Sequence, residues 1–173
     1  MDEKRIKIAE ENFGIYLKDG LIKRANFQEI IYQTYLNNSV ESLRVADEAF
    51  KNKISPLWVV VCSYYSMFYI ASAYIYKKGY KTSHEIVHQV VNEALIVLAR
   101  KDLEKHFLEE YEEERSKALS ASENLLDSYE FEKTKRSQFQ YETTGEIKES
   151  KAKTSLERAK NFVSVIRQLL QRN

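Results

Sequence analysis

An uncharged segment of twenty residues, Leu57 to Tyr76, constrains the fold more than any other part of the sequence. Its apolar side chains occur at every helical angle, and a helix that is apolar all round is buried on all sides. Ser55 suits the N-cap, Pro56 suits the first helical position, and Gly79 suits the left-handed position just past the end. The segment from about 55 to 78 is therefore predicted to be the central helix of a bundle.

A transmembrane helix is the alternative interpretation of this segment. Twenty residues rise about 30 Å as a helix, which is enough to cross a bilayer. However, five tyrosines and three serines lie within it, and lipid offers their hydroxyl groups no hydrogen-bond partner. The charged N-terminal residues are also unlike a signal peptide. We therefore expect a buried helix, no membrane association and a cytoplasmic protein.

Four glycines and one proline in 173 residues, with 31% charged residues, indicate long helices joined by short connections. The expected fold is all-α, an up-and-down bundle of five to six helices around the central helix. We expect one domain over 1–173, with an accessory helix at 1–20 and a core bundle at 27–170. The single cysteine, Cys62, excludes an internal disulfide and is expected to be a small core residue.

Apolar spacing predicts the remaining helices. Ile6, Ala9, Phe13 and Leu17 share one face of a helix at 2–18, and Asn26 with Glu29 would cap a helix that runs to about Asn52. The inner face of this second helix would include Phe27 and Ile30, and the pair Asn37-Asn38 could weaken its middle. Thr82 to Glu85 reads as a capping box, residues 102–133 are helical with a possible break at the acidic run 109–114, and residues 134–145 form a connection. The last helix has a regular apolar seam, made of Ala152, Leu156, Ala159, Val163, Ile166 and Leu170.

His84, Glu85 and His88 match the pattern H-E-x-x-H. On a helix, the two histidines would share a face and could hold zinc, with Glu85 activating a water. The third ligand of such a site is not indicated, since His106 has no motif around it. We therefore favour a capping box with two histidines at the surface edge, and expect no metal and no cofactor.

Two further features have competing interpretations. The tyrosines of the central segment are expected in the core rather than stacked on bases. Residues 101–132 carry a net charge of about −7 and residues 133–173 about +6, counted from the sequence. We favour two helix faces that attract each other over a basic surface for nucleic acid. Near the change of sign, Lys133, Lys135, Arg136 and Tyr141 form a candidate phosphate-binding group.

Three runs resemble the HEPN superfamily, most closely its small stand-alone bacterial and archaeal members. They are Tyr35-Leu-Asn-Asn-Ser-Val-Glu-Ser-Leu, Ser63-Tyr-Tyr-Ser-Met-Phe68, and Gly79-Tyr80 up to Ser83-His84. Arg136 with Tyr141 resembles the family's Arg-x-x-x-Asp-Tyr ending, and Ala159-Lys-Asn-Phe-Val resembles its last helix. The likeness covers about residues 27–170.

This resemblance implies a helical bundle that pairs into a homodimer, and it implies RNA or nucleotide binding in which Arg136 and Tyr141 match the family's arginine and tyrosine. Lys133 and Lys135 would add positive charge beside them. Some members are toxins with a minimal nucleotidyltransferase antitoxin, so a toxin–antitoxin or defence role is expected. Many are metal-independent ribonucleases whose motif pairs arginine with histidine. No histidine follows Arg136, and Gln140 stands where relatives often have an acid. A weak ribonuclease at a dimer cleft and a non-catalytic protein-interaction bundle therefore remain as alternatives.

Overall fold

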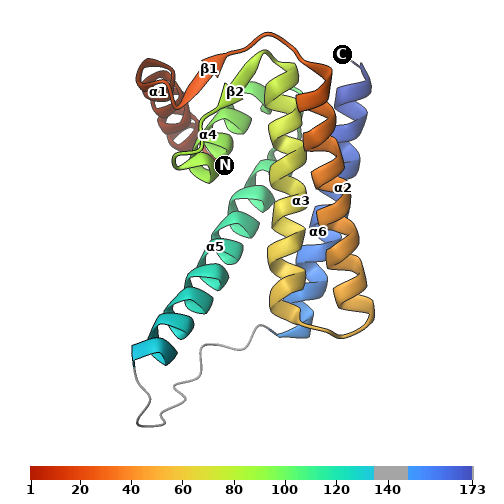
Figure 1. Cartoon of the computed structure of the whole chain (residues 1–173). Helices are drawn as coiled ribbons and strands as arrows, with labels where there is room; N and C mark the ends of the chain where they lie inside the picture. Colours follow the sequence, from red (N-terminus) through yellow and green to blue (C-terminus); the bar gives the residue numbers. More distant parts are fainter. Residues whose placement is uncertain (135–147, 173) are drawn as a thin grey trace.

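The computed structural model describes residues 1–134 and 148–172, and it describes side chains within 1–122 and 148–172 (Figure 1). Helices dominate this described part. Its elements are α1 (Glu3–Asp19), β1 (Ile22–Arg24), α2 (Glu29–Lys51), α3 (Pro56–Lys77), β2 (Tyr80–Thr82), α4 (Val87–Ala99), α5 (Lys105–Thr134) and α6 (Glu149–Arg172). The helix α3 lies at the centre and contacts α2, α4, α5 and α6. The chain is therefore the all-α bundle that the sequence predicts.

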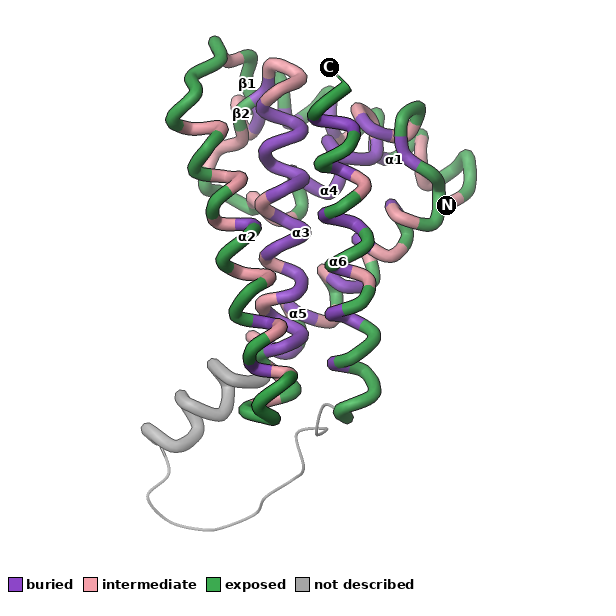
Figure 2. The backbone as a smooth tube through the Cα atoms, turned by 90° about the vertical axis from the view of Figure 1, so that its right-hand side faces the viewer, coloured by how far each residue is buried: buried purple, intermediate pink, exposed green. Residues whose placement is uncertain are grey.

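The central helix begins and ends where the sequence predicts. The Ser55 side chain accepts a hydrogen bond from the backbone N–H of Trp58, Pro56 opens the helix, and Gly79 follows its end with φ of 88°. Among the described residues, α3 alone is long and apolar enough to cross a membrane, and 78% of its apolar window is buried inside the fold. Figure 2 shows the buried residues concentrated along it. Neighbouring helices thus provide the surroundings that its apolar surface requires.

The last helix, α6, confirms the predicted seam in full. All six residues of the seam are buried, and three of them are small alanine or valine residues that allow α6 to lie close against α3. Apolar residues spaced alternately by four and three lie along one side of a helix, and that side packs against the core. This part of the fold follows from local periodicity alone.

The faces of α1 and α2 differ from the prediction. On α1 the buried stripe is Ala9, Phe13 and Tyr16, while Leu17 is exposed. Two apolar residues expected to face inward on the second helix, Phe27 and Ile30, are also exposed. Burial of these short stripes depends on which neighbour each helix meets, and periodicity does not specify that neighbour.

The start of α2 also differs from the prediction. Gln28 rather than Asn26 is the N-cap, and its side chain makes no capping hydrogen bond. Instead, the hydroxyl of Tyr76 accepts a hydrogen bond from the backbone N–H of Gln28 and donates to the carbonyl of Asn26. A tyrosine of the central helix therefore holds the entry to α2, in place of a local cap. The pair Asn37-Asn38 does not interrupt α2.

The predicted capping box at Thr82–Glu85 is wrong, because a small antiparallel sheet takes up its first residue. Thr82 pairs with Ile22 across β1 and β2, and the N–H of Ser83 donates to the carbonyl of Leu21 at 2.8 Å. The helix α4 therefore begins later, after Ile86, which has a left-handed φ of 39°. Strands of three residues are too short to show alternation in the sequence, so the sheet was not predicted.

The acidic run of α5 does not break the helix, since α5 continues through 109–114. Most of the predicted connection at 134–145 lies outside the described residues.

Candidate functional site

The binding residues predicted from the sequence fall at the edge of what the structure describes. Lys133 belongs to the last turn of α5, and its side chain is not among the described ones. Lys135, Arg136 and Tyr141 lie outside the described residues. Their assignment to phosphate binding therefore stays a prediction.

The zinc interpretation of the H-E-x-x-H motif is not supported by the structure. Because α4 begins at Val87, His84 and Glu85 precede the helix, and only His88 lies on it. The helical spacing on which the zinc geometry depends is therefore absent. Among the described residues, no group of three or more histidine, cysteine or acidic side chains is placed to hold a metal ion.

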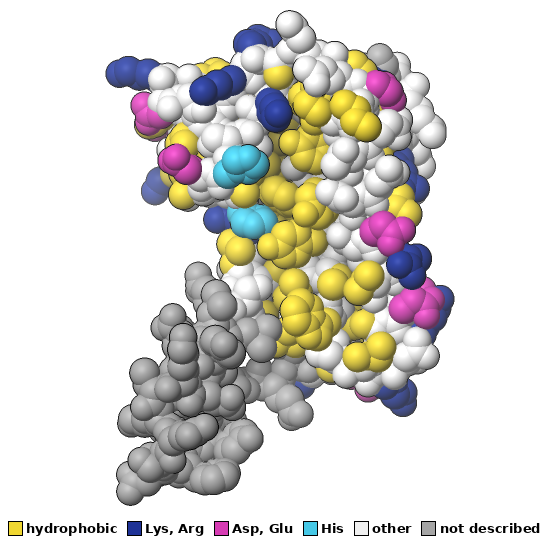
Figure 3. Space-filling view, in the orientation of Figure 1, with side chains coloured by type: hydrophobic (Ala, Val, Ile, Leu, Met, Phe, Trp, Pro, Cys, Tyr) yellow, Lys and Arg dark blue, Asp and Glu magenta, His cyan; other side chains and the backbone are white. Residues whose placement is uncertain are grey.

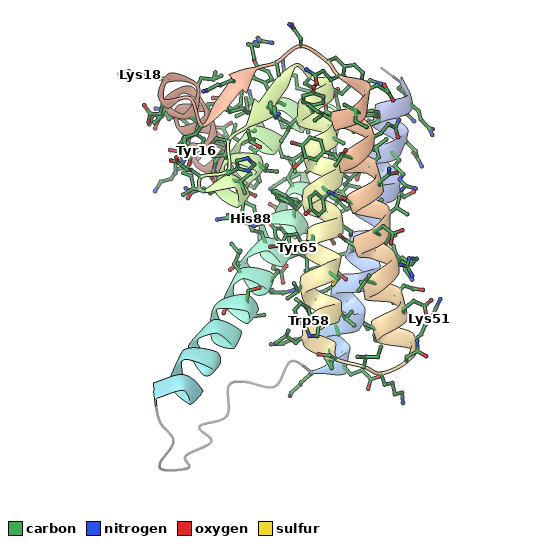
Figure 4. The ribbon with its side chains drawn as sticks, in the orientation of Figure 1. Tyr16, Lys18, Lys51, Trp58, Tyr65 and His88 are labelled. Atoms are coloured by element: carbon green, nitrogen blue, oxygen red, sulfur yellow. The ribbon has the colours of Figure 1, made fainter. Side chains whose placement is uncertain are left out.

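His88 instead lies in an aromatic cluster that joins α3 to α4. Its ring centroid is 4.6 Å from Phe68, 5.6 Å from Tyr64 and 5.6 Å from Tyr65. The Tyr65 ring meets the imidazole edge-on, at an interplanar angle of 85°. Figure 4 places His88 and Tyr65 close together, where α4 and α3 pack against each other. The imidazole is half-buried, so one side of this cluster reaches the surface.

A hydrogen bond fixes the orientation of the imidazole. The Tyr64 hydroxyl lies 2.9 Å from Nδ1 of His88, and it donates to Nδ1 when the ring carries its proton on Nε2. Burial and the positive charge of Arg115 both lower the pKa of His88 below its ordinary value of 6.5. Burial raises the pKa of Tyr64, so the phenol keeps its proton. At neutral pH the site therefore presents a neutral imidazole with its Nε2 side free of this bond.

Arg115, on α5, supplies the positive charge beside this cluster. Burial lowers the pKa of His88, and the charge of Arg115 adds to this effect; burial raises the pKa of Tyr64 and of Tyr111, and the same charge opposes that rise. Its Nε is buried and donates no hydrogen bond, and no ion pair within the described part of the chain includes it. The Arg115 side chain as a whole is only half-buried and carries a charge with no ion pair among the described residues. An anionic ligand that reached its guanidinium group would therefore gain a strong, charge-assisted hydrogen bond.

Other buried or half-buried arginines show what Arg115 lacks. Arg5, Arg100 and Arg158 each contact a glutamate through a guanidinium nitrogen. Arg158 of α6 contacts the acidic part of α5, with Nη1 2.8 Å from Glu113 and 2.9 Å from Glu114. These pairs agree with the prediction that the acidic and basic helix faces attract each other. Within the described residues, basic side chains of the same chain therefore largely neutralise the acidic face of α5.

Sequence reasoning missed Arg115 and gave His88 the wrong partners. Arg115 lies in the run Glu-Glu-Glu-Arg-Ser-Lys, where an arginine reads as one more member of a salt-bridged surface. The prediction that the tyrosines of the central helix lie in the core is confirmed for Tyr64, which is fully buried. Tyr65, in contrast, is only half-buried. The three contributing helices meet only in the folded bundle, so no local signal links these residues.

Comparison with known protein families gives one match. The family model described as "HEPN domain" matches residues 32–169, which contain α3, α4 and the cluster around His88 and Arg115. The match leaves α1 and β1 outside. No curated protein and no solved structure matches the chain.

Proposed function

Because the chain belongs to the HEPN family, whose domain is often related to nucleotides or RNA, we propose that it binds RNA or a nucleotide through Arg115 and His88. The observation that carries this proposal is the half-buried Arg115, which makes no ion pair among the described residues and whose charge acts on the neutral imidazole of His88 beside the Tyr65 ring. Arginine offers a fork of donors that suits phosphate, while tyrosine and histidine rings offer faces for bases. Phosphate and base recognition are thus available at one place.

The sequence-predicted residues enter this proposal as a second contact region. Lys133 lies eighteen residues beyond Arg115 on the same helix, which corresponds to a separation of about 27 Å along the axis. A mononucleotide is too small to touch both positions, whereas an RNA of several nucleotides can. We therefore assign Arg115 and His88 to the primary contact, and Lys133, Lys135, Arg136 and Tyr141 to additional phosphate contacts on a longer RNA.

Fluorescence anisotropy with a labelled single-stranded RNA of about ten nucleotides tests the proposal. Arg115→Met keeps most of the side-chain volume and removes the charge, so it is expected to weaken binding about 10-fold or more, the equivalent of one lost charge-assisted hydrogen bond. Arg44→Met is the matched control, because Arg44 is an exposed arginine on α2 paired with Glu41. Unchanged affinity in Arg115→Met, with an unchanged melting temperature, would refute the assignment.

The ribonuclease alternative gains one observation from the structure. The family's motif histidine does not follow Arg136, but His88 lies within the electrostatic reach of Arg115 and is favoured in the neutral form that accepts a proton. Incubation of the purified protein with labelled RNA, without added metal, tests this activity. Cleavage that survives in both His88→Asn and Arg136→Ala would exclude both proposed routes.

A protein partner is the remaining alternative. The acidic face that would dock a basic protein is engaged by Arg158 and Lys117 within the described residues, which disfavours this role. Pairing into a homodimer and association with a nucleotidyltransferase antitoxin are both proposed from the family. Co-purification with co-expressed candidate antitoxin, and the mass of the free protein in solution, are the measurements that decide them.

A further inference from the structure

An exposed aromatic stripe runs along α3, below the site at His88. Trp58, Cys62, Tyr65 and Tyr69 are separated by four, three and four residues, so they share one narrow face of the helix. Trp58 is 51% exposed and the other three are half-buried, while most other residues of α3 are buried. Figure 3 shows hydrophobic side chains gathered on this face, and Figure 4 places Trp58 and Tyr65 along it.

The arrangement of the helices explains why the described part of the chain leaves this stripe partly exposed. In Figure 1, α5 diverges from α3 as it leaves α4, so it covers the part of α3 near His88 and not the part near Trp58. The helices α2 and α6 pack on other sides of α3. Among the described side chains, Trp58, Tyr65 and Tyr69 are thus left partly open on the face of α3 that carries Tyr65, the ring in contact with His88.

Resting on the proposed function, we propose that this stripe stacks the bases of a single-stranded RNA whose phosphate binds Arg115. Tyr65 links the stripe to the site, because its ring is 5.6 Å from His88 and 6.0 Å from Tyr69. On the face that Figure 3 draws, no described acidic side chain lies within the hydrophobic stretch, so none would repel an RNA phosphate there. Aromatic side chains can stack on the flat face of any base, so a stripe of this kind suits unpaired bases of any sequence.

The geometry of the stripe predicts how long the bound RNA is and that it is single-stranded. Trp58 lies seven residues before Tyr65, the stripe residue in contact with His88, which corresponds to about 10 Å along the helix. A mononucleotide whose base stacks on Tyr65 or His88 leaves Trp58, beyond Cys62, without a base, and a duplex hides its base faces within its own stack. The protein should therefore prefer a single-stranded hexanucleotide over both a mononucleotide and the same hexanucleotide annealed to its complement.

Trp58 is the only tryptophan of the chain, so its fluorescence reports directly on this stripe. We expect adenosine monophosphate to leave the emission unchanged and a single-stranded hexaadenylate to quench it. By anisotropy with the labelled hexamer, Trp58→Ala should weaken binding at least 5-fold, the loss of one stacked base, and should leave the affinity for adenosine monophosphate unchanged. Ile15→Ala, which removes a similarly exposed apolar side chain from α1, is the control.

The outcomes separate this inference from the function on which it rests. If Arg115→Met weakens hexamer binding but Trp58→Ala does not, the stacking stripe is refuted and the proposed site stands. Equal affinity for the hexamer and its duplex likewise overturns the stripe alone. If Arg115→Met has no effect, or if neither nucleotide nor hexamer binds, the proposed function itself is refuted.

Discussion

Replacing Arg5 with methionine should destabilise the protein strongly, although Arg5 lies outside the region that matches the family. Arg5 joins α1 to two other helices: Nη1 and Nη2 lie 2.7 and 2.9 Å from the carboxylate oxygens of Glu93, and Nε lies 2.8 Å from Glu112. The Glu93 side chain is only 6% exposed. Without Arg5, a buried carboxylate on α4 loses its cation.

The magnitude follows from this burial. Removing one partner of a buried pair costs roughly 3–5 kcal/mol, because the remaining charge is left uncompensated. The Arg5 side chain is 24% exposed, so water can reach part of the site and the lower end applies, about 3 kcal/mol. For a chain of this size, such a loss lowers the melting temperature by about 6–12 °C.

Chemical denaturation monitored by circular dichroism measures this loss. Arg5→Met combined with Glu93→Gln removes the buried charge as well, so the double variant should recover at least about 1 kcal/mol of the single variant's deficit. Arg44→Met is the matched control, since the Arg44–Glu41 pair is exposed on both sides and should contribute less than about 1 kcal/mol. If the unfolding free energy of Arg5→Met lies within about 1 kcal/mol of the wild-type value, the contact between Arg5 and Glu93 does not stabilise the fold as argued.

Three further changes test other parts of the structure. The lowered pKa of His88 means that the unfolded chain takes up a proton first, so stability should fall as the pH drops below about 6.5, and His88→Asn should reduce that slope between pH 7.5 and 5.5. Tyr76→Phe should cost about 1–3 kcal/mol of unfolding free energy, because Gln28 and Asn26 lose their shared partner at the start of α2. Ile86→Gly should raise the unfolding free energy by about 1 kcal/mol, because Ile86 has a positive φ and an exposed side chain.

Two controls separate these explanations from a general effect of losing the side chain. Ile86→Ala keeps the positive φ while removing the same exposed side chain, so it should bring no gain; an equal gain would point to the side chain rather than the backbone. For Tyr76→Phe, faster hydrogen exchange should be confined to the first turn of α2, and a uniform increase over the bundle would contradict the proposed role.

The candidate site was only partly accessible from the sequence. His88 was noticed as one half of a zinc motif, but the strand pairing of Thr82 with Ile22 delays α4 and removes the motif's helical spacing. Arg115 was counted as a surface charge, because its neighbours in the chain are acidic. Which arginine remains unpaired depends on contacts with other helices, and such contacts leave no mark in a local window.

The sequence by itself determined the helices whose signals are local. These signals depend on neighbours within about two helical turns of the same chain. They are the residues at the ends of α3, Ser55 and Gly79, the uncharged segment around Tyr64, and the seam of α6. Only the tertiary structure decided where α4 begins, which face of α2 is buried, and that the charge of Arg115 acts on His88. Those outcomes depend on pairings between residues far apart in the chain, and their energies exist only once the helices are packed.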